Sequence, residues 1–393
     1  MPRVRNRLPR EVRVLVFAAF MIAIGYGVVA PALPVFARSF DVSVAAASAV
    51  VSAFAVARVL FAPVSGRMVG RWGELPVFCG GLSVVAVSSA ACAFAADYGQ
   101  LLAFRAAGGL GSTMFTVSAA SLLVRISPSA MRGRASGAWA TGFLLGSIAG
   151  PVVGGGLIAG SLRAPFFAYA AMLVLTVLIT GALLRGAVRS DPARPVAATV
   201  TFAGVVRQRA FRAALASNFV NGWTVYGVRV ALVPLFVVDV LHRPDGWSGI
   251  ALAAFAAGTG ATLLLGGRWA DRSGRRPPVL VGSATVAVTS LWVGLAGGMA
   301  ELLVASLVSG VGTGLMSPAV NASVTDVIAA RGREVNGGSA LAGFQMVGDV
   351  GAIIGPIAAG VIVEEAGYFA AFATTAAIAA VSFVYWVRVP TLR

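Results

Sequence analysis

The stretch GRMVGRWGELP, which begins at residue 66, recurs as GRWADRSGRRP from residue 267, a shift of 201 residues. The same shift places QLLAFRAAGGLG, at residues 100–111, on ELLVASLVSGVG, at residues 301–312. A third pair follows, MRGRASG from residue 131 and ARGREVNGG from residue 330, each ahead of a glycine-rich segment that contains Gly-Pro. Three matches in the same order indicate a duplication, so the chain consists of two related halves.

The composition indicates a membrane protein. Apolar residues make up 58% of the chain and charged residues 11%, whereas about one quarter of a soluble domain is charged. The apolar residues fall into stretches of about 20, the length at which an α-helix crosses a hydrocarbon layer of about 30 Å. We therefore predict an all-α membrane protein with twelve transmembrane helices. The predicted spans are residues 14–36, 44–66, 75–95, 99–124, 135–159, 165–184, 213–235, 247–267, 277–297, 301–325, 335–363 and 368–387.

The placement of the arginines predicts the orientation of these spans. The net charge is +16, and every basic residue except His242 is arginine. Most arginines lie in every second connection between the spans, so they fall on one side of the membrane. On a soluble protein this charge would suggest a nucleic-acid partner, but the alternation follows the rule that arginine-rich loops stay in the cytoplasm. We expect a multi-pass protein of the inner, or plasma, membrane, with both termini cytoplasmic, surrounded by lipid and without a nucleic-acid partner.

The domain boundary is placed in the single long segment between spans, residues 185–212, which is rich in arginine and contains Pro192 and Pro195. The predicted parts are a basic N-terminus at 1–13, a six-helix bundle at 14–184, a cytoplasmic linker at 185–212, a second six-helix bundle at 213–387 and a tail at 388–393. Because each half has an even number of spans, the bundles run parallel and are related by a pseudo-twofold axis along the membrane normal. Transporters of this arrangement bind substrate near the midplane, between the halves.

These segments resemble the major facilitator superfamily over nearly the whole chain. Gly25, Pro31 and Pro34 are similar to the GxxxxxPxxP pattern of drug-transporting members, and the two repeated loops occupy the place of the family's G-x-x-x-D-R-x-G-R-R element. The second copy is intact, whereas Gly70 replaces the aspartate of the first copy and Glu74 stands where its arginine pair begins. The resemblance implies cytoplasmic gating loops, and the alternative is that the loops only satisfy the rule on basic residues. The gating residues would be Gly66, Arg67, Arg71, Gly73, Gly267, Asp271, Arg272, Gly274 and Arg275.

The span at 135–159 contains GSIAGPVVGG, residues 146–155, in which glycines recur every four residues. One face of this helix therefore lacks side chains, and a neighbouring helix can approach closely. The segment resembles the G-x-x-x-G-P-x-x-G-G element that marks exporters which exchange substrate for protons. The matching residues are Gly146, Gly150, Pro151, Gly154 and Gly155.

Four ionisable residues lie within the spans, where each costs several kcal/mol unless it is paired or hydrated. They are Arg58, Arg105, Arg229 and Asp349. Arg105 resembles the arginine of the family's R-x-x-x-G element, which is linked to proton coupling, although Gly108 replaces the usual glutamine. The alternative is an arginine that snorkels to the headgroups.

Arg58 and Asp349 lie at similar depth in spans that pack together in the family. We hypothesise an ion pair that breaks during transport, with Asp349 as the proton acceptor. Desolvation favours the protonated carboxyl and a nearby arginine favours the ionised one, so relative movement would switch its protonation. A permanent ion pair that only fixes packing is the alternative.

The segment NFVNGWTVYGVRV places a polar face on the span at 213–235, one of the cavity-lining spans of the family. With the tyrosine of the first span it would suit a bulky, partly apolar ligand. The predicted cavity residues are Tyr26, Asn218, Asn221, Trp223 and Tyr226, and ordinary packing between helices is the alternative.

The leading hypothesis is a proton-coupled exporter of small amphipathic molecules or drugs that works by alternating access. The spans at 14–36 and 99–124 contain no Asp or Glu, which disfavours strongly cationic substrates. The alternatives are an importer or facilitator of a small polar metabolite, and a membrane sensor or scaffold that transports nothing. No Walker loop or metal-ligand cluster is present in the sequence, so we predict neither an enzyme nor a cofactor nor a metal site. We expect a monomer.

Overall fold

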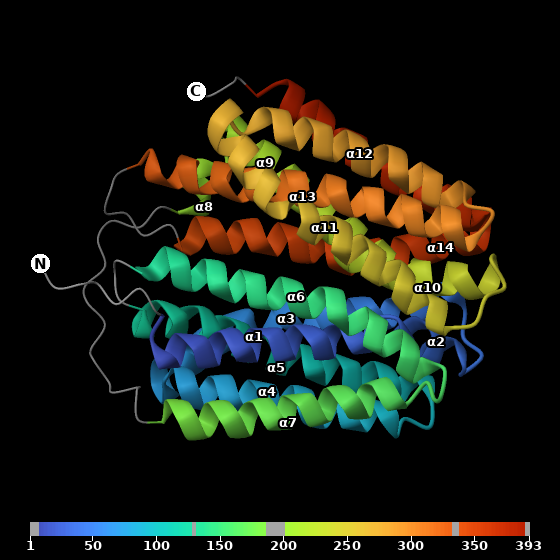
Figure 1. Cartoon of the computed structure of the whole chain (residues 1–393), viewed down its shortest axis with the longest axis horizontal. Helices are drawn as coiled ribbons and strands as arrows, with labels where there is room; N and C mark the ends of the chain where they lie inside the picture. Colours follow the sequence, from blue (N-terminus) through green and yellow to red (C-terminus); the bar gives the residue numbers. More distant parts are fainter. Residues whose placement is uncertain (1–7, 128–130, 186–200, 332–337, 390–393) are drawn as a thin grey trace, which may run out of the picture. The chain divides into compact units, whose positions relative to one another are not determined.

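The computed structural model describes residues 8–127, 131–185, 201–331 and 338–389, and these residues are helical apart from short connections. The first half contains α1 (Arg10–Val29), α2 (Ala32–Arg38), α3 (Val44–Trp72), α4 (Glu74–Ala93), α5 (Tyr98–Ile126), α6 (Arg132–Ile158) and α7 (Ala164–Leu184) (Figure 1). The second half contains α8 (Phe202–Val205), α9 (Arg209–Asn221), the π-helix η2 (Gly222–Arg229), α10 (Val230–Asp239), α11 (Gly246–Ser273), α12 (Arg276–Leu295), α13 (Met299–Ala329) and α14 (Gly338–Val387). No strand occurs among the described residues, so the predicted all-α class is confirmed.

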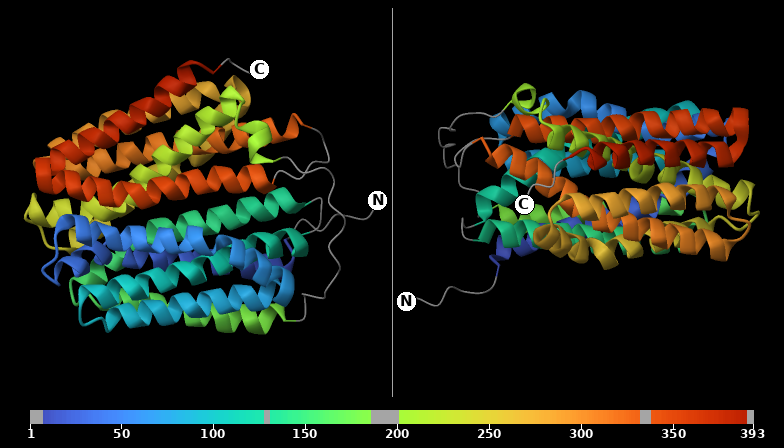
Figure 2. Two further views of the ribbon diagram at one scale, coloured as in Figure 1. Left: turned by 180° about the vertical axis from the view of Figure 1, so that it is seen from behind. Right: turned by 90° about the horizontal axis from the view of Figure 1, so that it is seen from above.

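Eleven helical segments of the described chain are long and apolar enough to cross a membrane. The last of them, Ser339–Val387, has 49 residues and would be about 74 Å long as one helix, more than twice the thickness of the hydrocarbon layer. It is interrupted at Gly367, whose φ of 81° and ψ of 172° are not helical. Figure 2 shows α14 turning back on itself. The segment thus contains both of the last two predicted spans, and the total is twelve.

The seventh span begins earlier than the sequence predicts. The helix α9 starts at Arg209 and not at residue 213, and α8 lies within the segment 185–212 that we expected to be a linker. Residues 186–200 of that segment lie outside the described residues. The span continues through η2 into α10, so a π-helix occupies its middle.

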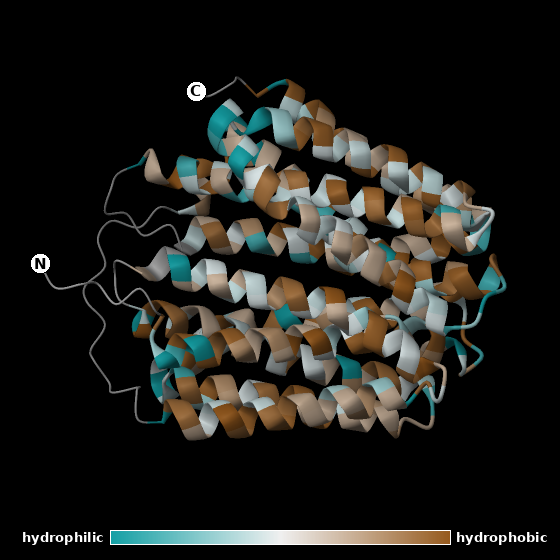
Figure 3. Ribbon diagram, viewed as in Figure 1, coloured by the Kyte–Doolittle hydropathy of each residue, from teal (hydrophilic) through white to brown (hydrophobic). Residues whose placement is uncertain are grey.

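The surface of the helices fits a lipid environment. Large apolar side chains stand exposed along the outsides of both halves, for example Leu60, Leu178 and Leu264, the last of them 72% exposed. Such apolar surface is unusual on a soluble monomer. In Figure 3 the hydrophilic residues gather at the helix ends, and few interrupt the middle of a helix. The protein is therefore a multi-span membrane protein.

Contacts between Cα atoms divide the chain into two units, Met1–Phe36 with Ala53–Pro192, and Ala37–Ser52 with Ala193–Arg393. The first turns of α3 belong to the second unit because they pack on α14. The backbone N–H of Ala45 donates to Glu364 at 2.8 Å, and the hydroxyl of Ser52 donates to the carbonyl of Ile353 at 2.7 Å. Glu364 thus caps the N-terminus of α3, and the bond from Ala45 together with that of the Ser43 side chain lowers the pKa of its carboxyl.

The two repeated loops have the same backbone conformation. Gly73, between α3 and α4, has φ 83° and ψ 167°, and Gly274, between α11 and α12, has φ 84° and ψ 170°. This region of φ and ψ is accessible almost only to glycine. The shift of 201 residues that relates the sequences therefore also relates two turns of one geometry.

We expect Gly73→Ala to lower the stability of the protein by about 1–3 kcal/mol, because a side chain at this φ is strained. No atom lies within 4 Å of a Cβ added at Gly73, so backbone strain is the whole effect. Gly70→Ala is the matched control, since Gly70 is helical with equally open surroundings and alanine favours helices. Thermal unfolding of both variants in one detergent measures the difference; equal stabilities would contradict the strain.

Candidate functional site

Arg105 lies inside the first unit, stacked on an aromatic ring. Its Cζ is 4.2 Å from the ring centroid of Phe54 of α3, and the residue is only 7% exposed. An arginine that snorkels would reach outward along the helix, so that interpretation of Arg105 is wrong. The guanidinium is stabilised by the π face of Phe54, and its Nε is buried without a hydrogen-bond partner.

Close packing of α5 holds Arg105 in this position. A Cβ added at Gly108 would lie 2.6 Å from the Oγ of Ser88, and one at Gly109 would collide with the carbonyl oxygen of Phe54. Ser88 in turn donates to the carbonyl of Phe104 at 2.6 Å. The glycine that stands in place of the family's glutamine therefore lies in a close contact between α5 and α4.

Two tyrosines complete the surroundings of this stack. Tyr26 of α1 has its ring 6.4 Å from that of Phe54. Tyr169 of α7 is 2% exposed and packs where Gly25, the residue before Tyr26, has no side chain. Neither Tyr169 nor Phe54 belongs to a recognised motif, so the sequence alone did not indicate them.

Arg229 forms a similar stack in the second unit. Its Cζ is 4.2 Å from the ring centroid of Phe255 of α11, and its two terminal nitrogens donate to Ser306 at 3.4 Å and Ser309 at 2.8 Å. Arg229 is 5% exposed. Phe255 occupies the position of Phe54 shifted by 201 residues, so both stacks use the same phenylalanine of the repeat.

The predicted polar face of the seventh span is partly used in packing. Asn218 donates to the carbonyl of Phe344 at 2.7 Å, and the indole of Trp223 donates to Thr375 at 3.1 Å, both partners lying in α14. Tyr226 is 49% exposed and Asn221 is half-buried. A role in substrate contact stays a prediction for these residues and for Tyr26.

Arg58 and Asp349 are both half-buried on membrane-spanning helices, α3 and α14. They belong to different units. The hypothesis that they form an ion pair which breaks during transport stays a prediction.

The glycine element of α6 packs directly on α1. A Cβ added at Gly146 would lie 2.5 Å from the carbonyl oxygen of Phe20, and one at Gly150 would lie 2.5 Å from that of Ile24. Gly154 faces the carbonyl of Val28 in the same way, while the ring of Pro151 fits against Gly27. Gly155 follows as a buried residue. The prediction that this face admits a neighbouring backbone is confirmed.

The same packing recurs in the second unit, where α14 packs on η2 and the end of α9. Gly351 faces the carbonyl of Phe219, and a Cβ added at Gly227 would lie 3.0 Å from the ring of Pro356, as Gly27 faces Pro151 in the first unit. The first and seventh spans are therefore each contacted through glycine and proline by the fifth span of their own half.

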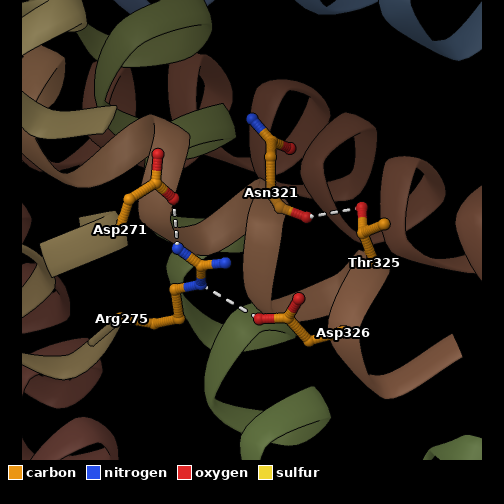
Figure 4. A network of polar contacts seen from close by, with 5 residues as sticks. All are labelled: Asp271, Arg275, Asn321, Thr325 and Asp326. Carbon is orange, nitrogen blue, oxygen red and sulfur yellow. Dashed lines mark hydrogen bonds and ion pairs between the residues drawn. The ribbon is translucent and has the colours of Figure 1, made fainter. Parts of the chain in front are cut away.

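The intact loop of the second unit holds a network of ion pairs, shown in Figure 4. Arg275 donates to Asp271 at 2.7 Å and to Asp326 of α13 at 3.0 Å. The hydrogen bonds to Asp326 and Asp271 raise the pKa of Arg275 above its ordinary value. The network ties the loop between α11 and α12 to the end of α13.

The first unit has an ion pair at the same two positions with the charges exchanged. Glu74 accepts from Arg125 of α5 at 2.7 Å. Shifted by 201 residues, Glu74 falls on Arg275 and Arg125 falls on Asp326, so acid and base have changed places. Gly70 fits this exchange, because Asp271 contacts Arg275 at the equivalent positions, and an aspartate at position 70 would therefore lie near Glu74 and repel it. The loop that lacks the family's aspartate is thus tied to its neighbouring helix by a reversed pair.

The remaining loop residues contribute less to this contact. The arginines that follow the first glycine of each loop are exposed; they are Arg67, Arg71, Arg268 and Arg272. Gly66 has open space around it, and Gly267 has only an ordinary contact with Pro318. Arg125 and Asp326 were not among the predicted residues, although they occupy equivalent positions at the repeat shift of 201 residues.

Groups of three or more His, Cys, Asp or Glu that could hold a metal ion do not occur in the described part of the chain. The candidate site consists of charged and aromatic side chains inside the bundles and of ion pairs at their ends.

Comparison with known sequences identifies what this chain resembles. A model of the Major Facilitator Superfamily matches residues 15–244 and 214–392. NorA, the quinolone resistance protein of Staphylococcus aureus, is 28% identical over 175 residues, which cover 44% of this chain and 45% of NorA. The chain thus matches less than half the length of this curated relative.

Solved structures share the fold. A bacterial homologue of the human lysosomal transporter Spinster, in an inward-facing and occupied conformation, superposes with a TM-score of 0.79 over 96% of this chain and 95% of its own, at 16% identity. A POT family transporter in complex with a thioalcohol-conjugated peptide gives the same TM-score over the same shares, at 10% identity. At these identities the likeness concerns the fold alone.

Proposed function

The chain belongs to the major facilitator superfamily, whose model covers nearly all of it, and from that premise we propose that it exports small amphipathic molecules in exchange for protons. The family and the fold are those of transporters. Direction, substrate and coupling are the proposed part. Export by alternating access from a plasma membrane with both termini in the cytoplasm is the function that the sequence and the geometry support best.

The observation that carries the proposal is the contact between α6 and α1. The element GSIAGPVVGG resembles that of exporters which exchange substrate for protons, and each of its glycines at spacing four faces the backbone of α1. Similarity to a quinolone resistance protein over part of the chain supports export of drug-like molecules.

The proposed coupling uses charges inside the spans. Asp349 takes up the proton, Arg58 stabilises its ionised form, and Arg105 supplies a fixed positive charge in the first unit. The ion pairs of Glu74 with Arg125 and of Arg275 with Asp326 hold the gating loops against their helices.

Reconstitution of the purified chain into proteoliposomes with an imposed pH gradient tests this function. We expect a fluorescent quinolone to move against the direction of proton flow, and collapse of the gradient to stop net movement. Flux of equal size with and without the gradient would contradict coupling, and binding without any flux would favour the sensor or scaffold.

We expect Asp349→Asn to lower gradient-driven flux by about tenfold or more, because an amide cannot take up the proton. Glu365→Gln is the control, since Glu365 is an exposed acid beyond the predicted eleventh span and should keep full flux. Flux in the same proteoliposomes measures both. Gradient-driven transport by Asp349→Asn at the wild-type rate would end the acceptor role.

A further inference from the structure

Arg229 is a buried cation whose partners in the structure are all neutral. Arg229 is the last residue of η2. Its guanidinium donates hydrogen bonds to the hydroxyls of Ser306 and Ser309 and stacks on the ring of Phe255. Among the described residues no carboxylate forms an ion pair with it. A charge buried within a membrane span costs several kcal/mol unless it is compensated.

The guanidinium also has N–H donors that no atom of the described residues accepts. It carries five N–H groups, of which the two serines accept two, and its Nε is buried without a hydrogen-bond partner. A buried donor without an acceptor is destabilising, because it has given up its hydrogen bonds to water. The Nε–H and the neighbouring Nη–H form the edge that binds a carboxylate through two parallel hydrogen bonds.

The repeat shows that this cation is not simply inherited from the duplication. The residue equivalent to Arg105 in the second half is Ser306, so the second half has no arginine at that position. The seventh span supplies Arg229 instead, and its guanidinium stacks on Phe255, the equivalent of Phe54, at the same 4.2 Å. Ser306 now accepts a hydrogen bond from Arg229. A cation over this phenylalanine is thus present in both halves by different routes.

The placement of Arg229 next to an irregular backbone is a further observation. The eight residues Gly222–Arg229 form a π-helix, and such segments interrupt α-helices frequently at functional sites. Tyr226, on the same segment, is half-exposed, and the ring of Phe255 covers one face of the guanidinium. An apolar body and one anionic group would match these surroundings.

We propose that Arg229, with Phe255 beneath it, is the subsite for the carboxylate of an amphipathic organic anion, which the transporter carries. The transport of that anion rests on the proposed function, whereas its binding at Arg229 does not. The stack is covered in this structure, so the carboxylate reaches Nε when the residues over Arg229 move, as alternating access requires. Asp349 is the one acid that the sequence places deep within the spans, which disfavours a cation at this position.

The test compares binding of 1-naphthaleneacetate and its neutral amide, 1-naphthaleneacetamide, to the purified full chain by titration calorimetry in detergent. We expect the wild type to bind the carboxylate about tenfold more tightly than the amide, equivalent to about 1.4 kcal/mol. Arg229→Gln should bring the ratio to about one without weakening the binding of the amide. Arg105→Gln, which removes the equivalent stack of the first unit, should keep most of the preference.

Two further variants keep the test decisive if Arg229→Gln fails to fold. Arg229→Lys keeps the charge without the two-donor edge and should reduce the ratio, and Ser309→Ala frees an Nη–H and should not reduce it. A wild type that binds the carboxylate no better than the amide, or a folded Arg229 variant that keeps the full ratio, overturns the proposal. Carboxylate binding without gradient-driven flux would overturn the proposed transport function but not the subsite. Coupled export of neutral compounds alone would overturn the subsite but not the transport function.

Discussion

Gly150→Val is expected to abolish transport and to lower the stability of the protein by about 3 kcal/mol or more. A Cβ at this position would lie 2.5 Å from the carbonyl oxygen of Ile24 and 2.8 Å from the Cα of Gly27. Both neighbours are backbone atoms, so no rotamer change can relieve the collision, and α6 must separate from α1. Thermal unfolding in detergent and flux in proteoliposomes measure the two effects.

Gly156→Val is the matched control. It lies on the same helix, two residues after Gly154, and no atom lies within 4 Å of a Cβ added there. The low helix propensity of valine affects both variants alike, so the difference between them reports the contact with α1. If Gly150→Val unfolds at the same temperature as Gly156→Val, the close approach of α1 and α6 is contradicted.

Reversal of the charge of Glu74 or of Arg125 is expected to have the second large effect, on the stability of the protein. We expect Glu74→Arg alone and Arg125→Asp alone each to cost about 3 kcal/mol, because each puts two like charges into a mostly buried contact. The double variant copies Arg275 and Asp326 of the second half and should recover most of the loss. The double-mutant cycle on thermal stability gives the coupling between the two residues.

The reverse exchange in the second half is the control, and it should fail. In Arg275→Glu with Asp326→Arg, the new glutamate replaces the arginine that Asp271 contacts at 2.7 Å, so two acids face each other. In the first half Gly70 occupies the equivalent position, so no third charge opposes the exchange. Recovery in both halves would show that Asp271 has no part in the network, and recovery in neither would contradict the equivalence of the two pairs.

Much of the fold could be predicted from short stretches of sequence. Each predicted span corresponds to a helix, because the length of an apolar run decides whether it can cross the membrane. The turn glycines Gly73 and Gly274 were predicted as equivalent and have nearly the same φ and ψ. The α6 glycines were predicted to admit a neighbour and do so. These features depend on residues close together in the chain.

The candidate site was predicted less completely. Arg105 and Arg229 were identified as buried charges, but Phe54, Phe255 and the serines that hold Arg229 were not. Asn218 and Trp223 were assigned to a cavity, and the structure uses both in contacts with α14. An arginine in a span can stack on an aromatic ring, pair with an acid or reach out to the lipid headgroups. The residues next to it in the sequence do not distinguish these three cases.

The sequence by itself determined the class of protein, the number of spans, the duplication and the conformation of the repeated loops, since hydrophobic length and backbone preference act locally. The tertiary structure alone decided that Glu74 replaces a lost contact and does not merely interrupt a motif. Its partner Arg125 is 51 residues away, as Asp326 is from Arg275. The sequence gives the sign of a charge but not the residue that pairs with it. The pairing depends on which helices pack side by side and on where along them the two residues meet.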